Sequence, residues 1–459
     1  MELVIKNGTL VTATDTYQAD LRIANEQIVQ IGQNLSPEPD ARVLDATGKL
    51  VFPGGVDPHT HLESTSQGTT TADDYLTGTI AAACGGTTSI VNFCFQEKGK
   101  SLDHSLSYFT VSARDKAAID YGFHAMICDL TDAVLDEIVT LPARGVTSIK
   151  LFMAYRGSLM VDDRTILRTL RAAKQNGILV MVHAENGDAA DMLQQQYLTS
   201  GDIAPKFHAP SRPPRVEAEA TARASALAEL AGAPIYFVHV SCGEAVDEIL
   251  RARARGVKVM GETCTHYLYF NEEDLDRPNF EGAKWVYTPP PRGKHMPALM
   301  WQALRQGSLG LVASDHCPYN FDGQKDLGAE DFTRIPNGAP GIEERMMFTY
   351  QGVNEGKLSL NRFVDLVSTT AAKTFGLYPN KGSIAVGSDG DLVIWNPNAE
   401  MTMTRSALHG EVDYTLYEGQ QVRGMPETVT LRGQVIVENR QYVGTPGTGR
   451  FIARSTYGV

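Results

Sequence analysis

The chain has 459 residues, of which 42% are hydrophobic and 21% charged, the composition of a globular protein rather than a disordered or fibrous one. Lys and Arg number 41 against 54 Asp and Glu, a net charge of −13 at pH 7, and no cluster of basic and aromatic residues is present, so no nucleic acid partner is expected. The six cysteines are scattered without a Cys-x-x-Cys pair, which argues against a disulfide framework and a thiolate zinc site.

The N-terminal part of the chain predicts short strands and turns. It lacks the basic and apolar segments of a signal peptide, and no apolar run in the chain reaches the ~18 residues of a membrane helix. We therefore expect a cytoplasmic protein without a membrane partner. The predicted strands here are residues 3–5, 9–11, 21–23, 28–31 and 42–44.

From about residue 53 to residue 377, apolar and β-branched runs alternate with helical stretches such as 216–231 and 245–255. Eight βα units in series favour a (β/α)8 TIM barrel, although an open doubly wound sheet has the same periodicity. The eight predicted strands are residues 50–57, 87–93, 121–127, 147–152, 178–183, 234–240, 257–262 and 309–315.

The last eighty residues resemble the first fifty, with predicted strands at 392–395, 428–431 and 434–438. Because the two ends of a barrel lie close together, we expect these β-rich ends to meet in one sandwich. The predicted organisation is a (β/α)8 barrel and a smaller β-sandwich domain built from both termini. The barrel covers residues 53–379, and the β-sandwich domain comprises residues 1–52 and 380–459, the latter including a C-terminal tail.

Six candidate metal ligands fall at the carboxyl ends of the predicted barrel strands, where barrel active sites are built. Residues two apart in an extended segment point to the same side, so His59 and His61 can bind one ion. Four imidazoles and one aspartate are too many for a single zinc ion with an open position, and the sequence therefore predicts two divalent ions. The candidates are His59, His61, Lys150, His183, His239 and Asp315.

Lys150 is the unusual member of this set, because two dications would repel its ammonium group. Reaction of the neutral amine with CO2 would give a carbamate, N6-carboxylysine, with one oxygen for each ion. Two divalent ions balanced by this carbamate, Asp315 and a bridging hydroxide leave a single positive charge that attracts a polarised carbonyl. Zinc is the expected metal, and manganese, cobalt and nickel suit the same ligands. His266 and His316 also lie near strand ends and are weaker candidates for groups that contact the ligands.

Several motifs together carry a resemblance to a known family. They are PGGVDPHTH at 53–61, SIKLF at 148–152, VHAEN at 182–186, VHVS at 238–241, SDHCP at 314–318 and IPNGAPGIEER at 335–345. This set resembles the amidohydrolase superfamily, and within it the dihydropyrimidinases, whose bacterial members are called D-hydantoinases. The resemblance extends over essentially the whole chain.

The resemblance implies a role for each candidate ligand and an assembly. The more buried zinc ion is held by His59, His61 and Asp315, the more exposed one by His183 and His239, and carboxylated Lys150 lies between them. The family is usually tetrameric, so a homotetramer is expected.

The resemblance also implies the reaction, which is hydrolysis of the ring amide of 5,6-dihydropyrimidines or 5-substituted hydantoins to N-carbamoyl amino acids. The substrate partner is thus a small cyclic amide or imide. Asp315 would take a proton from the attacking water and pass it to the leaving nitrogen, while Tyr155 hydrogen-bonds the scissile carbonyl. Asn337 and backbone groups near Thr288 match the positions that bind the ring amides.

Two loops are expected to surround the ring substituent, residues 62–72 and 152–161. In the second loop Phe152, Leu159 and Met160 offer an apolar surface. One departure affects the opposite wall. Relatives commonly have Ser-Pro-Pro-Leu-Arg where this chain has Thr-Pro-Pro-Pro-Arg at 288–292, a change that can alter how the wall presents its backbone.

Three other functions share features with this sequence. Dihydroorotase is disfavoured because its substrate carboxylate needs a cation, commonly in the pattern His-x-His-x-Arg, and this chain has Glu63 at that position. Allantoinase remains the main alternative. A non-catalytic scaffold protein of the cytoskeleton is a weaker one, because such relatives have lost metal ligands and this chain has all six.

Overall fold

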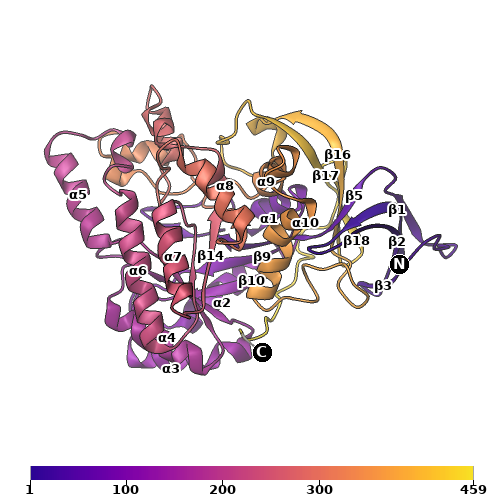
Figure 1. Ribbon diagram of the computed structural model, residues 1–459, viewed down its shortest axis with the longest axis horizontal. Helices are drawn as coiled ribbons and strands as arrows, with labels where there is room; N and C mark the ends of the chain where they lie inside the picture. Colours follow the sequence, from indigo (N-terminus) through magenta and orange to yellow (C-terminus); the bar gives the residue numbers. More distant parts are fainter. Residues whose placement is uncertain (1, 458–459) are drawn as a thin grey trace.

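The central feature of the computed structural model, which describes residues 2–457, is an eight-stranded parallel sheet in the order β15-β14-β13-β12-β11-β10-β9-β6. A parallel bridge between Thr60 and His316 joins its two end strands, and the N–H of His61 donates to the carbonyl of His316 at 2.9 Å. The sheet is thus closed, and helices surround it (Figure 1). The predicted (β/α)8 barrel is confirmed.

The barrel strands are almost entirely buried, as expected for parallel strands covered on both faces, and this explains why they are continuous apolar runs in the sequence. They are β6 (Gly55–Thr60), β9 (Thr87–Cys94), β10 (Asp120–Met126), β11 (Ser148–Phe152), β12 (Leu179–His183), β13 (Ile235–Phe237), β14 (Val259–Cys264) and β15 (Leu311–Ala313).

Helices follow the strands along the chain, and the predicted helices at 216–231 and 245–255 correspond to α6 and α7. Asp74 begins α1 with a capping box, and Gly232 ends α6 in the left-handed conformation. The helices are α1 (Tyr75–Cys84), α2 (Leu102–Ala113), α3 (Asp132–Thr140), α4 (Asp163–Gln175), α5 (Gly187–Thr199), α6 (Pro214–Ala231), α7 (Gly243–Ala254), α8 (Met296–Gln306), α9 (Glu344–Asn354), α10 (Leu360–Val364) and α11 (Thr370–Thr374). Within residues 2–457 none of them is both long and apolar enough to cross a membrane.

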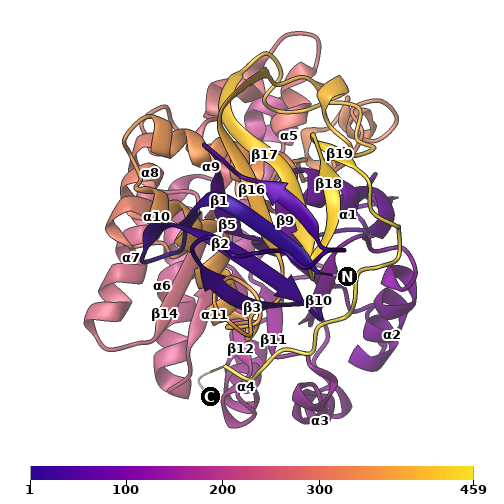
Figure 2. The same cartoon turned by 90° about the vertical axis from the view of Figure 1, so that its right-hand side faces the viewer.

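A second, mostly antiparallel sheet joins the two ends of the chain, in the order β19-β18-β17-β16-β5-β1-β2-β3 with β4 beside β1 (Figure 2). A separate apolar core, which includes Leu21, Val51 and Ile394, packs within it. The predicted β-sandwich domain is therefore confirmed. Its strands are β1 (Leu3–Val11), β2 (Thr16–Ala24), β3 (Gln27–Gly32), β4 (Arg42–Asp45), β5 (Leu50–Pro53), β16 (Leu392–Thr402), β17 (Gln421–Leu431), β18 (Gln434–Glu438) and β19 (Gln441–Tyr442).

The single strand predicted for residues 50–57 is wrong, because the chain changes sheet at Gly54. Residues before it form β5, which pairs with β16 and β1, and residues after it form β6 of the barrel. A Cβ at Gly54 would lie 2.0 Å from Oγ1 of Thr88, so only glycine fits here. Both halves are apolar and buried, and hydrophobic periodicity does not reveal the change of sheet.

The C-terminal tail crosses the amino ends of the barrel strands, opposite the carboxyl ends that carry the candidate ligands. Phe451 pairs with Tyr121 at the start of β10, and the N–H of Ile452 donates to the carbonyl of Tyr121 at 2.7 Å. The buried guanidinium of Arg454 reaches the barrel interior and donates to Ser148 Oγ at 2.9 Å. The tail therefore closes this end of the barrel.

Candidate metal centre and substrate cavity

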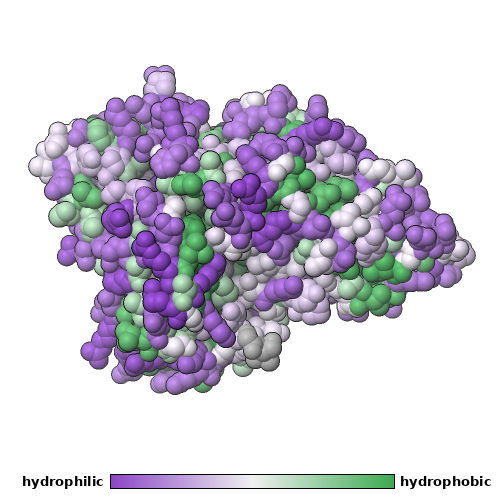
Figure 3. Space-filling model, in the orientation of Figure 1, coloured by the Kyte–Doolittle hydropathy of each residue, from purple (hydrophilic) through white to green (hydrophobic). Residues whose placement is uncertain are grey.

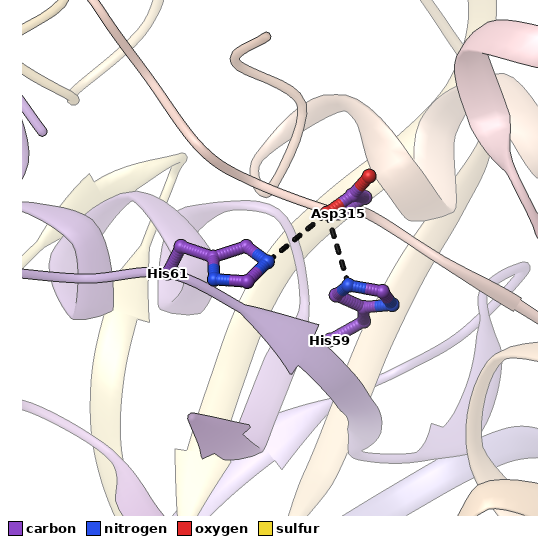
Figure 4. Close-up of side chains that lie close together, drawn as sticks. All are labelled: His59, His61 and Asp315. Atoms are coloured by element: carbon purple, nitrogen blue, oxygen red, sulfur yellow. Dashed lines mark ion pairs between the residues drawn. The ribbon is translucent and has the colours of Figure 1, made fainter. Parts of the chain in front are cut away.

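Three of the candidate ligands converge on one point at the carboxyl end of the barrel. His59 lies on β6, His61 follows it directly, and Asp315 lies two residues beyond β15. Oδ1 of Asp315 is 3.0 Å from Nε2 of His59 and 3.3 Å from Nε2 of His61, and Figure 4 shows both imidazoles pointing toward the carboxylate. Their ligand atoms lie within 4.8 Å of one another, a spacing that fits one metal ion.

A second pair of imidazoles lies beside this group. Nδ1 of His183 is 2.9 Å from Nε2 of His239, and the ring centroids of His59 and His239 are 5.4 Å apart. On its other side, Nε2 of His183 donates to the carboxylate of Glu185 at 2.7 Å. Nδ1 of His183 therefore presents a lone pair to His239, an arrangement that needs a proton or a metal ion between the two nitrogens.

Lys150 lies on β11 in the same part of the barrel and is 1% exposed. Among the residues that the structure describes, its Nζ has no hydrogen-bond partner, and it lies 4.7 Å from the ring centroid of Phe93 and 4.9 Å from that of Phe152. Burial lowers the pKa of Lys150 to about 8. A buried amine that has no hydrogen-bond partner and a lowered pKa is suited to react with CO2. These properties therefore fit a lysine that becomes a carbamate and bridges two ions.

The charges around the first group favour a cation. Burial lowers the pKa of His59, but Asp315 and Glu262 outweigh it and raise that pKa to about 9. Burial lowers the pKa of His61 to about 4. Burial also works to raise the pKa of Asp315, yet the two imidazoles hold it well below its usual range. The pair of carboxylates thus stabilises positive charge at this point, and the donor set fits a divalent ion.

Two buried carboxylates, which were not predicted from the sequence, hydrogen-bond ring nitrogens of two candidate histidine ligands. Glu262 on β14 hydrogen-bonds Nδ1 of His59, and Glu185 accepts from His183 and, at 2.8 Å, from Arg212. Carboxylates in this position fix the tautomer and orientation of metal-binding histidines. The available signal was an acidic residue in or directly after an otherwise apolar strand.

Three of the predicted site residues have left-handed backbones although they are not glycine. The φ angles are 66° at Tyr155, 39° at His239 and 49° at Asp315. Such conformations are costly for residues with a Cβ, and they cluster at functional sites where the surrounding fold holds them. The strain supports a functional reading of these positions.

A cavity of about 660 Å³ opens beside the ligands. Phe152, Tyr155, Leu159, Thr288 and Asn337 line it together with the six candidate ligands. Met160 is not among the lining residues and packs against Gly187 instead.

Part of the cavity wall was not predicted. Phe95, which follows β9, and Tyr108 and Phe109 of α2 add an aromatic surface to the wall. Nothing in the sequence distinguishes these aromatic residues from ordinary packing residues.

The wall near residue 288 is held by a buried ion pair. Arg292 donates to Glu217 at 2.7 Å and to Ser241 Oγ at 2.9 Å. Thr288 Oγ1 donates to Oδ1 of Asn337 at 2.6 Å, so two predicted substrate-binding residues contact each other. The Thr-Pro-Pro-Pro-Arg sequence at 288–292, in which this chain departs from the family pattern, therefore still allows Arg292 to bind Glu217 and Ser241.

The two weaker candidates also have defined places. His316 lies 3.1 Å from Asp73 through Nε2 and accepts from the N–H of Gly341 at 3.2 Å through Nδ1. The ligand atoms of His266, Cys264 and Asp315 lie within 4.8 Å of one another, and within residues 2–457 Nε2 of His266 has no hydrogen-bond partner.

Comparison with known proteins gives one consistent result. A model of the amidohydrolase family matches residues 50–436. The D-hydantoinase of Rhizobium radiobacter is 55% identical over 457 residues, which is 100% of both chains, and that of Geobacillus stearothermophilus is 51% identical over 100% of this chain and 98% of its own. The crystal structure of dihydropyrimidinase from Brevibacillus agri NCHU1002 has a TM-score of 0.99 at 51% identity, covering 100% of both chains. The chain belongs to the amidohydrolase family, among its D-hydantoinases and dihydropyrimidinases.

Proposed function

We propose that this protein is a binuclear-metal cyclic amidohydrolase that opens the ring amide of 5,6-dihydropyrimidines or 5-substituted hydantoins to N-carbamoyl amino acids. The observation that carries the proposal is the convergence of all six candidate ligands beside one cavity. Relatives named D-hydantoinase match the whole chain and do not favour the allantoinase alternative.

Two divalent ions, zinc in our proposal, fit the donor set. His59, His61 and Asp315 would hold one, His183 and His239 the other, and carboxylated Lys150 both. When bound, the ions lower the pKa of a water molecule toward neutrality and polarise the ring carbonyl. Two observations support the carbamate. Among the described residues the Nζ of Lys150 has no hydrogen-bond partner, and Lys150 lines the same cavity as the imidazoles and the carboxylate that would hold the two ions.

The residues of the chain supply the remaining chemistry. The carboxylate of Asp315 takes the proton of the attacking water and delivers it to the leaving ring nitrogen. Burial raises the pKa of Tyr155, so its hydroxyl stays protonated and donates to the oxygen of the scissile carbonyl. Asn337 and the backbone near Thr288 bind the ring amides from the opposite wall.

The cavity favours neutral, bulky ring substituents. Phe95, Phe152 and Leu159 line it with apolar surface, whereas Glu63 and Glu97 are its carboxylates away from the ligands. Glu63 is paired with Lys116 at 3.2 Å, so its charge is partly balanced, but neither carboxylate offers the cation that a substrate carboxylate, as in dihydroorotate, would need. Chelator-sensitive opening of hydantoins with apolar 5-substituents is therefore expected before that of dihydroorotate.

Three further features complete the proposal. A homotetramer in the cytoplasm is supported by family resemblance and, for the compartment, by six cysteines that form no disulfide. The division into a barrel at 53–379 and a sandwich domain at 1–52 and 380–459 is supported by the change of sheet at Gly54.

The test is a side-by-side assay of the purified protein, supplied with zinc and bicarbonate, on dihydrouracil, 5-substituted hydantoins, allantoin and dihydroorotate. A chelator-treated sample is the control. We expect chelator-sensitive opening of dihydrouracil or a hydantoin. Opening of allantoin alone would favour the allantoinase alternative, and no opening despite two bound metal ions would overturn the proposal.

A further inference from the structure

A small hairpin stands at the rim of the cavity, and its tip contacts the opposite wall. It consists of β7 (Thr65–Ser66) and β8 (Thr69–Thr70), joined by Gln67 and Gly68. Both joining residues have positive φ, 53° and 82°, which is the two-residue turn that usually has Asn or Gly first. A glutamine in this strained place calls for a reason beyond the turn itself.

The side-chain amide of Gln67 is bound to Asn337 from 270 residues away in sequence. Its Oε1 accepts from the backbone N–H of Asn337 at 2.8 Å and from Nδ2 of the same residue at 2.8 Å. Its Nε2 donates to the backbone carbonyl of Asn337 at 3.2 Å. One amide thus uses both the donor and the acceptor of the Asn337 backbone.

This pairing matches what a ring amide would need. A cyclic amide or imide presents a carbonyl oxygen and an adjacent N–H, as the Gln67 side chain does, and Gln67 and Asn337 both line the cavity. The Asn337 groups are partly accessible, because neither residue is buried. Gln67 and the substrate would compete for the same hydrogen-bonding groups.

We propose that Gln67 is a specificity-determining latch, an internal amide that occupies the ring-binding groups of Asn337 and is displaced by the substrate. The inference rests on the proposed function, in which Asn337 binds the ring. It follows that the apparent affinity is reduced by the fraction of molecules in which the latch is closed. A ligand that offers only a carbonyl or only an N–H leaves either the backbone N–H or the backbone carbonyl of Asn337 without a partner when it displaces Gln67. Such a ligand should therefore bind more weakly than one that offers both groups.

The latch has an alternative that makes the opposite prediction. If Gln67 instead held Asn337 in place for the substrate, its removal would weaken binding. Removal of a competing latch strengthens binding. The direction of the change in KM therefore separates the two roles.

The test uses the metal-loaded full-length protein and two variants of the tip. Gln67→Met keeps the length of the side chain without its hydrogen bonds, and Gln67→Gly also relieves the positive φ. For the best hydantoin substrate of the wild type, we expect KM to fall by about 3- to 30-fold in both variants, the effect of the net free energy of one or two such exposed hydrogen bonds, with kcat within about twofold. Hydrogen exchange of the peptide that contains Asn337 should become faster in the free variants, because its N–H loses its acceptor.

A matched control is Thr70→Val in the same hairpin, because the Thr70 side chain, unlike that of Thr65, does not line the cavity. It removes the 2.9 Å hydrogen bond between the hydroxyls of Thr65 and Thr70 without contacting Asn337, and KM should not fall. Equal melting temperatures and metal contents establish that the variants are folded. If the wild type opens hydantoins but KM is unchanged or raised in the two Gln67 variants, the latch is overturned and the proposed function stands. A wild type that opens no ring would overturn the proposed function and the latch with it.

Discussion

Glu262 fixes His59 from the side that faces away from Asp315. Its carboxylate hydrogen-bonds Nδ1 of the imidazole, and its other oxygen accepts from the hydroxyl of Tyr236 at 2.7 Å. Nδ1 therefore carries the hydrogen, and the lone pair of Nε2, 3.0 Å from Asp315, is left for a metal ion.

The first prediction concerns this carboxylate. Glu262→Ala should weaken binding of the more buried metal ion by about 10- to 100-fold, because His59 loses its orientation. Metal content measured against a competing chelator checks this. Tyr236→Phe keeps the carboxylate and should lose much less metal. Equal affinities in the Glu262 variant and the wild type would contradict the role.

The second prediction concerns proton transfer. Asp315→Asn keeps an oxygen ligand but cannot accept a proton, so turnover of hydantoins should be nearly abolished while metal remains bound. Ring-opening rates and metal analysis of the same preparation are the measurements. Turnover near that of the wild type would remove Asp315 from the role of general base.

The third prediction isolates the hydroxyl of Tyr155. Tyr155→Phe keeps the ring, which lies 5.4 Å from that of His183 and 5.5 Å from the guanidinium of Arg212, and removes only the donor. We expect kcat to fall by about 10²- to 10³-fold, the scale of one oxyanion donor. Steady-state kinetics at equal metal content provide the comparison, and an unchanged kcat would reassign the residue.

The fourth prediction concerns Lys325, a fully buried ammonium that binds three backbone carbonyls instead of a carboxylate. It donates to Val286 at 2.7 Å, Pro336 at 2.8 Å and Gly338 at 2.7 Å, and the last two flank Asn337. Burial lowers the pKa of Lys325 to about 7, whereas the three carbonyls favour its protonated form.

Lys325→Met should therefore loosen the wall that carries Asn337, since each carbonyl left without a donor costs about 1–3 kcal/mol. We expect KM to rise about tenfold or more, with unchanged metal content and kcat within a few fold. Lys284→Met is the control, because Lys284 precedes Val286 by two residues but pairs with Glu281. A variant that lost metal and kept KM would contradict this assignment.

The fifth prediction is a pH dependence of stability. Burial and the neighbouring Glu343 raise the pKa of Glu344 from its usual 4.5 to about 7. The folded state then binds the proton more tightly than the unfolded state, so its contribution is fully present below pH 4.5 and is lost as the pH rises through 7. The loss amounts to about 3 kcal/mol at most.

Glu344→Gln cannot ionise and keeps an acceptor for Thr415, whose hydroxyl donates to the carboxylate at 2.8 Å. Between pH 5 and pH 8, the free energy of unfolding of the variant should fall less than that of the wild type. Urea denaturation at both pH values gives the comparison. If the free energy of unfolding falls by the same amount in the two proteins, a group other than Glu344 is responsible for the pH dependence.

The sequence predicted parallel strands in βα units because these strands are buried on both faces, and eight such units in series favoured the barrel. It placed the candidate ligands together because ligands in barrels follow strand ends. His59, His183 and Asp315 could be found in this way from local patterns alone. Gln67, Glu262 and Lys325 could not, because each acts on a partner that is distant in sequence, such as Asn337 for Gln67. Their local sequences resemble those of ordinary surface or core residues.

The pairing of β5 with β16 has a consequence for how the protein is made. Leu50 is aligned with Trp395, and β5 also separates β1 from β16 in the shared sheet. During synthesis the N-terminal strands therefore leave the ribosome long before their partner exists, and they expose an open edge while the whole barrel is being translated. Completion of this sheet must await nearly the last part of the chain, which makes slow, post-translational closure and a need for protection from aggregation the expected behaviour during expression.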